Sequence, residues 1–230
     1  MNLSGKSNLL RLFNKIIMKL SLKRLSFFIF FIPTFTVILS YIFSLYLNLV
    51  PSCIPILDGC TSISRTGRYF PVNVFFKTLM FVSGILILLY WYKNYDFFNK
   101  QKCSYLLNIS CAFGFISIIF LFLYLIFLGE NNYYKFFRKI GVFIYLFFSV
   151  ISELLLSIIY KINYKNMLLN QVNINYKLIL SIFLLSIGII FLPLMTTKIE
   201  NVSNLRNIIS WNYFLLIQVN FLLTFMIWRQ

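Results

Sequence analysis

Apolar residues dominate this chain in long runs, and polar residues are confined to shorter stretches between them. A run of about 20 apolar residues is long enough to cross the hydrocarbon core of a bilayer as a helix. Six runs reach that length and predict six spans, at residues 25–49, 74–92, 105–128, 140–160, 178–196 and 208–228. The pattern therefore predicts an all-α fold, a polytopic transmembrane bundle of six helices.

The composition supports a membrane protein over a soluble one. Apolar residues make up 60% of the 230 positions and charged residues only 11%, against about 25% charged residues in ordinary soluble domains. A bilayer accepts an apolar outer surface that water does not. We therefore expect an integral membrane protein, and the pattern leaves open a plasma membrane, an endomembrane or a bacterial inner membrane.

The basic residues lie between the apolar runs, so the net charge of +16 does not indicate a nucleic-acid partner. Segments rich in Lys and Arg favour the cytoplasmic side, and six such residues precede the first span. This predicts a basic cytoplasmic segment at 1–24, a membrane domain at 25–230 and both termini in the cytoplasm. The same count assigns Lys177 to a cytoplasmic loop at 161–177.

The longest connection, at 50–73, is predicted to be an ordered outer loop because it is rich in Pro, Gly and Cys. Cys53 and Cys60 are either a disulfide or two free thiols on the oxidising side of the membrane. Two interpretations of the loop are compatible with each other. It is a cap that seals the bundle, or a surface that binds lipid headgroups, or both. The headgroup candidates are Ser64, Arg65, Arg68 and Lys77.

Glu153 is an acid inside the fourth span, where an ionisable group is costly unless it is paired or neutral. It belongs to a flank that repeats every four residues and is expected to face the bundle interior: Gly141, Tyr145, Ser149, Glu153 and Ser157. A functional role and a structural hydrogen bond are both open for this carboxyl group. The candidate polar partners are Asn108, Asn212 and Asn220, with Gln218 on the opposite side of the last span.

Candidate catalytic chemistry is sparse. The chain has no His and only five acids, which removes the commonest general base and metal ligand. Neither a phosphate-binding glycine loop nor a dinucleotide fingerprint is present. We expect no enzyme, no catalytic residue, no cofactor and no metal.

Three short stretches carry a resemblance to a known family. Ile63-Ser-Arg-Thr-Gly67 with the following Pro71 and Phe75-Phe76, the segment Asn207-Ile-Ile-Ser-Trp211 and the segment Phe137-Arg-Lys-Ile-Gly141 resemble motifs of the Frag/DRAM/Sfk family. That family groups the damage-regulated autophagy modulators, the yeast Sfk-type proteins and the GPI-anchor lipid-remodelling factor. Arg65 and Ser210 stand where the family usually has acids. The resemblance implies six helices and a role in membrane-lipid homeostasis.

The leading functional hypothesis is a multi-pass protein that binds or organises membrane lipids, in lipid homeostasis or asymmetry. The alternative is a transporter of lipids or small molecules that uses Glu153. A membrane-embedded lipid-modifying enzyme is a weaker third. The expected partners are membrane lipids, with other membrane proteins or further copies of the chain as possibilities.

Overall fold

The computed structural model describes residues 21–99, 104–129, 134–164, 169–196 and 203–228. These residues form six long helices and two short ones: α2 Leu22–Tyr46, α3 Pro55–Asp58, α4 Ile63–Thr66, α5 Val72–Phe98, α6 Ser104–Ile126, α7 Tyr134–Asn163, α8 Gln171–Thr196 and α9 Ser203–Ile227. The six long helices are long and apolar enough to cross a membrane. The predicted all-α, six-span architecture is therefore confirmed.

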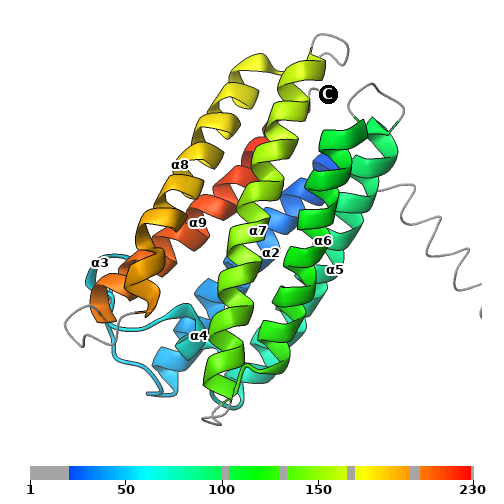
Figure 1. Cartoon of the computed structure of the whole chain (residues 1–230). Helices are drawn as coiled ribbons and strands as arrows, with labels where there is room; N and C mark the ends of the chain where they lie inside the picture. Colours follow the sequence, from blue (N-terminus) through cyan, green and yellow to red (C-terminus); the bar gives the residue numbers. More distant parts are fainter. Residues whose placement is uncertain (1–20, 100–103, 130–133, 165–168, 197–202, 229–230) are drawn as a thin grey trace, which may run out of the picture.

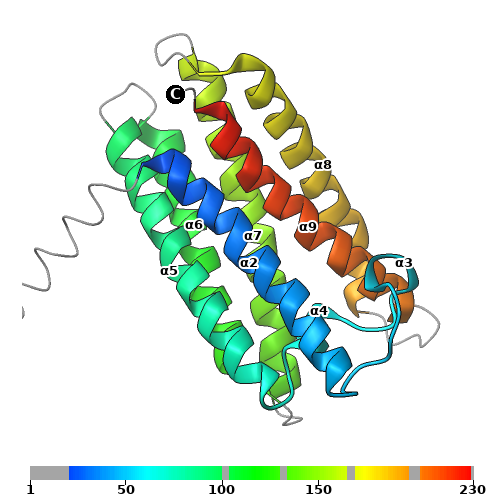
Figure 2. The same cartoon turned by 180° about the vertical axis from the view of Figure 1, so that it is seen from behind.

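The long helices form a closed ring. Each one packs against the next along the chain, and α9 closes the ring on α2, as Figures 1 and 2 show. Large apolar side chains face outward along the bundle, including Phe31, Ile119 and Ile179 at 47%, 62% and 62% exposure. An outer surface of this kind is compatible with lipid and not with water.

The two ends of the ring differ in the connections they carry. We call the end that carries α3 and α4 the capped end, and the opposite end the terminal end. Helix α2 begins and α9 ends at the terminal end (Figures 1 and 2). Residues 1–20 of the basic N-terminal segment lie outside the described residues. The placement of the terminal end in the cytoplasm stays a prediction.

The loop before α5 is an ordered cap. Its short helices lie against α2 and α9, and side chains of α9 donate to its backbone: Asn207 to the Gly59 carbonyl at 2.7 Å and Trp211 to the Thr61 carbonyl at 2.9 Å. On the other side the Ser44 hydroxyl of α2 donates to the Thr66 carbonyl at 2.6 Å. These contacts fix the loop against the bundle.

Gly59 is required where α3 meets α9. Its backbone is left-handed, with φ of 64°, a conformation that strains other residues. A Cβ atom there would also lie 2.8 Å from the Ile208 side chain and clash with the Asn204 backbone. The close approach of α3 to α9 therefore depends on this glycine.

Helix α8 begins earlier than the apolar run predicts. The fifth span was predicted to start at residue 178, whereas the helix starts at Gln171. The Asn170 side chain accepts hydrogen bonds from the backbone N–H groups of Val172 and Asn173 at 3.1 and 3.5 Å, which caps the first turn. The assignment of Lys177 to a loop is therefore wrong, because this residue lies in the second turn of α8.

Aromatic side chains fill the interior of the bundle toward the terminal end. Tyr90 packs on Phe221 with ring centroids 5.7 Å apart, and Tyr160 packs on Phe98 at 5.5 Å. Because these rings come from α5, α7 and α9, they join helices that are not neighbours in the ring. The interior is packed with aromatic rings there.

Candidate functional site

A buried ion pair joins α7 to α8. The Lys177 ammonium lies 2.5 Å from one carboxylate oxygen of Glu153. The two residues are 0% and 2% exposed. Glu153 lies about 15 Å from the terminal end of α7, taking 1.5 Å of rise per residue, so the pair lies inside the membrane domain. An ion pair at this depth needs further hydrogen bonds to offset the loss of hydration.

Helix α9 supplies those hydrogen bonds through Asn220. The Lys177 ammonium also donates to the Asn220 side-chain oxygen at 2.5 Å and to its carbonyl at 3.3 Å. The Asn220 amide in turn donates to the Ser181 hydroxyl at 2.7 Å. One cation thus has acceptors on α7 and α9 while its own helix, α8, lies between them. We call Glu153, Lys177 and Asn220 the three-helix triad.

Three buried polar atoms of the bundle interior lack a hydrogen bond of good geometry among the described residues. They are one carboxylate oxygen of Glu153, the Gln218 carbonyl oxygen and the Tyr90 hydroxyl. Tyr90 lies close enough to Glu153 for the two groups to interact electrostatically. The Tyr90 hydroxyl of α5 thus lies beside the carboxyl group of the triad, and buried polar atoms are usually paired in this way.

Two of the predicted partners of Glu153 are wrong. Asn108 is exposed on α6. Asn212 donates to the Ile56 carbonyl in the cap at 3.1 Å and to the Ile208 carbonyl at 2.9 Å. Asn220 does belong to the site, although it reaches Glu153 through Lys177. The placement of Glu153 itself follows the prediction, since all five residues of its four-residue repeat are buried.

Sequence reasoning missed Lys177, the direct partner of Glu153. An apolar run marks only the lipid-facing and densely packed part of a helix, and Lys177 lies just before that run. The signal that could have found it is Asn170, a favoured N-cap residue seven positions upstream. A helix started at that cap carries Lys177 into the bundle.

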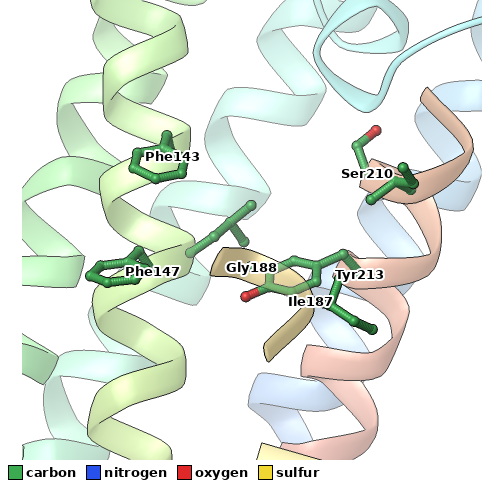
Figure 3. Close-up of a pocket in the computed structure, with 8 residues that line it drawn as sticks. Phe143, Phe147, Ile187, Gly188, Ser210 and Tyr213 are labelled. Atoms are coloured by element: carbon green, nitrogen blue, oxygen red, sulfur yellow. The ribbon is translucent and has the colours of Figure 1, made fainter. Parts of the chain in front are cut away.

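A pocket lies toward the capped end between α7, α8 and α9 (Figure 3). It has about 60 Å³ of free volume, several times the roughly 10–15 Å³ that holds one water. Its lining is apolar apart from two hydroxyls, and most of it is partly exposed, so the pocket is open at the surface. The lining residues are Phe143, Leu146, Phe147, Ile187, Gly188, Ile209, Ser210 and Tyr213.

The headgroup candidates of the cap differ in their surroundings. Ser64 and Arg65 lie on α4, with Ser64 half-buried beside Ser62 and Arg65 exposed. Lys77 is half-buried in the second turn of α5. Arg68 turns inward, and its Nε atom is buried without a hydrogen-bond partner. Arg68 is therefore the candidate with the most distinctive surroundings.

Cys53 and Cys60 are paired as a disulfide within the cap, as one of the two predicted alternatives had it. The Tyr41 hydroxyl of α2 donates to the Cys53 carbonyl, so the disulfide loop is also held against the bundle. Among the described residues, no group of three His, Cys, Asp or Glu side chains could hold a metal ion.

Residues that carry the family resemblance meet at the capped end. Gly67 packs against the ring of Phe76, and Trp211 donates to Thr61 next to the loop motif. Comparison with protein-family models, curated proteins and solved structures finds no match for this chain. The chain is a multi-pass membrane protein by its six helices, and its relation to the Frag/DRAM/Sfk family stays a prediction.

Proposed function

We propose that this protein binds a membrane lipid, with part of an acyl chain in the pocket between α7, α8 and α9. The observation that carries the proposal is the pocket itself. It is open at the surface of the bundle, it is lined almost entirely by apolar groups, and it has about 60 Å³ of free volume. A space of this size fits a segment of a lipid chain and not a whole lipid.

Basic residues lie one helical turn from the pocket in the direction of the capped end. Lys139 precedes Phe143 by four residues on α7, and Arg206 precedes Ser210 by four on α9. Residues four apart share a helix face, so each cation lies above a lining residue. A lipid whose chain enters the pocket would bring its headgroup to the level of these two residues.

The test is photo-crosslinking of a lipid chain in the full-length protein. The protein is reconstituted in nanodiscs with a phospholipid that carries a diazirine in its acyl chain, and labelled peptides are mapped by mass spectrometry. We expect labelling of the α7 segment that contains Phe143 and Phe147. Gly188→Leu should reduce it several-fold, because even a Cβ atom at Gly188 lies 3.0 Å from the Tyr213 hydroxyl.

Ser186→Leu is the matched control. Ser186 lies two residues before Gly188 on the same helix but is exposed, so the same side chain is added outside the pocket. Labelling in this variant should match the unmodified chain. Equal labelling in both leucine variants would contradict the proposal, because filling the pocket would then have no effect on the lipid.

Transport coupled to Glu153 is a second candidate function. The observation that favours it is the buried ion pair of Glu153 and Lys177, because an ionisable group inside a membrane domain could take up and release a proton. Proton uptake by proteoliposomes tests it. Transport predicts loss of uptake in Glu153→Gln/Lys177→Met, a variant that replaces the ion pair by neutral groups. Uptake equal to that of the unmodified protein would remove this candidate.

A further inference from the structure

Arg68 of the cap and Arg138 of α7 both lie at the end of α6, where they are linked by hydrogen bonds to the neighbouring residues Leu128 and Gly129. Arg138 of α7 is 7% exposed, and its charge acts directly on that of Arg68 in the cap. The Tyr124 side chain of α6 interacts electrostatically with both guanidinium groups. Two like charges in a partly buried place repel each other, so the chain must hold them together by other contacts.

Those contacts are hydrogen bonds around the end of α6. Asn73 donates to the Arg68 carbonyl at 2.7 Å and to the Leu128 carbonyl at 3.1 Å. The Arg138 Nη1 atom donates to the Gly129 carbonyl at 2.9 Å. The Arg68 backbone and the Arg138 guanidinium are thereby held at the same turn.

The described residues do not neutralise this pair. Of the three acids in the described part of the chain, Glu153 is paired with Lys177, Asp58 accepts from the Ile54 N–H at 2.8 Å, and Asp96 lies near the terminal end of α5. The carboxyl end of α6 offers about half a negative charge, against two full positive charges. The Arg68 Nε atom is also buried without a partner.

The geometry points to a binding site for a phosphate-type oxyanion between Arg68 and Arg138. Guanidinium groups bind phosphate oxygens through paired N–H donors, and one bound anion would remove the repulsion and satisfy the Arg68 Nε donor. The site lies at the capped end, one turn into α7, where phospholipid headgroups would lie. The site is separate from the acyl-chain pocket, so the proposal of an anion site and the proposal of lipid binding can be disproved independently.

Thermal unfolding of the full-length protein tests this site. The protein is purified in a maltoside detergent, which carries no phosphate group, and inorganic phosphate is compared with chloride at equal ionic strength. We expect phosphate to raise the unfolding temperature of the unmodified protein. Arg68→Gln and Arg138→Gln should each weaken the apparent affinity for phosphate roughly tenfold or more, because each removes a charge-assisted hydrogen-bonding group.

Arg65→Gln is the matched control, since Arg65 is exposed on the same loop and its replacement removes the same charge. This variant should respond to phosphate like the unmodified protein. In chloride, Arg68→Gln should unfold at a higher temperature than Arg65→Gln, because it relieves the repulsion. In saturating phosphate that order should reverse. Equal phosphate responses in all variants would overturn the proposal.

A second arm distinguishes the source of the anion. Maltoside micelles that contain phosphatidic acid are compared with micelles of the maltoside alone, in the absence of free phosphate. Stabilisation by phosphatidic acid alone assigns the site to a lipid headgroup, and stabilisation by inorganic phosphate assigns it to a free anion. Stabilisation by neither overturns the proposal.

Two further variants keep the test decisive. If Arg138→Gln does not fold, Arg138→Lys retains the charge and should still lose phosphate affinity, because lysine lacks the paired donors. Glu130 lies outside the described residues. One result would assign the neutralising charge to Glu130 and overturn the proposal. In that result neither anion changes the unfolding temperature of the unmodified protein, whereas phosphate raises that of Glu130→Gln.

Discussion

The two buried charged sites of this bundle differ in how completely the chain neutralises them. Glu153 and Lys177 have opposite charges and share Asn220 as a third member. Arg68 and Arg138 have the same charge, and among the described residues Arg138 has a carbonyl acceptor while both arginines have Tyr124 as a neighbour. The triad can hold three helices together without help. The arginine pair is left dependent on an anion from outside the described structure.

This difference separates structural from binding roles. A buried pair that is complete contributes mainly to the arrangement of the helices, whereas a site that lacks a counter-charge gains stability when a ligand supplies it. The triad is therefore expected to respond to mutation with a change in stability that is the same with and without phosphate. The arginine pair is expected to respond in a way that depends on phosphate.

Replacement of Lys177 should have the largest effect. Lys177→Met leaves the Glu153 carboxylate buried without its cation and removes the donor to Asn220. Breaking a buried ion pair from one side costs about 3–5 kcal/mol, and uptake of a proton by Glu153 would reduce that cost. Unfolding by heat or denaturant in nanodiscs measures it, and phosphate should leave the difference unchanged.

The double variant Glu153→Gln/Lys177→Met should recover much of that loss, since neither residue is then charged. Lys161→Met is the control, because Lys161 is exposed in the last turn of α7. If Lys177→Met were as stable as Lys161→Met, the triad would not hold the helices together. The structural role that distinguishes the triad from the arginine pair would then be wrong.

The sequence predicted the spans well because six apolar runs report directly on lipid exposure. It predicted the interior position of Glu153 because a polar repeat of four follows a helix face. It could not predict Lys177 as the partner, since the start of α8 depends on a cap at Asn170 and not on hydropathy. The sequence also could not predict that Arg68 lies near Arg138, because only tertiary packing joins the cap to α7.

Removal of the Asn73 side chain should have an intermediate effect on the arginine pair. Asn73→Ala deletes the two hydrogen bonds that tie Arg68 and Leu128 together, at a cost of about 1–3 kcal/mol. The phosphate response should also weaken, because Arg68 is then free to move from Arg138. Titration with phosphate, read by thermal unfolding, measures both effects.

Thr78→Ala is the control for this variant. Its hydroxyl donates to the Val74 carbonyl within the same helix at 2.7 Å, so its loss is local and should leave the phosphate response intact. A normal phosphate response in Asn73→Ala would show that Arg68 stays in place without the two Asn73 hydrogen bonds, and the role assigned to Asn73 would be wrong.

Replacement of Asn108 should have the smallest effect on the unfolding temperature, because this residue lies outside the triad. Asn108 is exposed on α6, and exposed substitutions usually change stability by less than about 0.5 kcal/mol. Asn108→Leu should therefore unfold at nearly the same temperature as the unmodified protein. Asn220→Leu makes the same chemical change at a buried position that accepts from Lys177 and donates to Ser181, and should cost about 1–3 kcal/mol. Equal destabilisation of the two leucine variants would mean that Asn108 also contributes to the interior. The assignment of Asn220 as the third member of the triad would then be wrong.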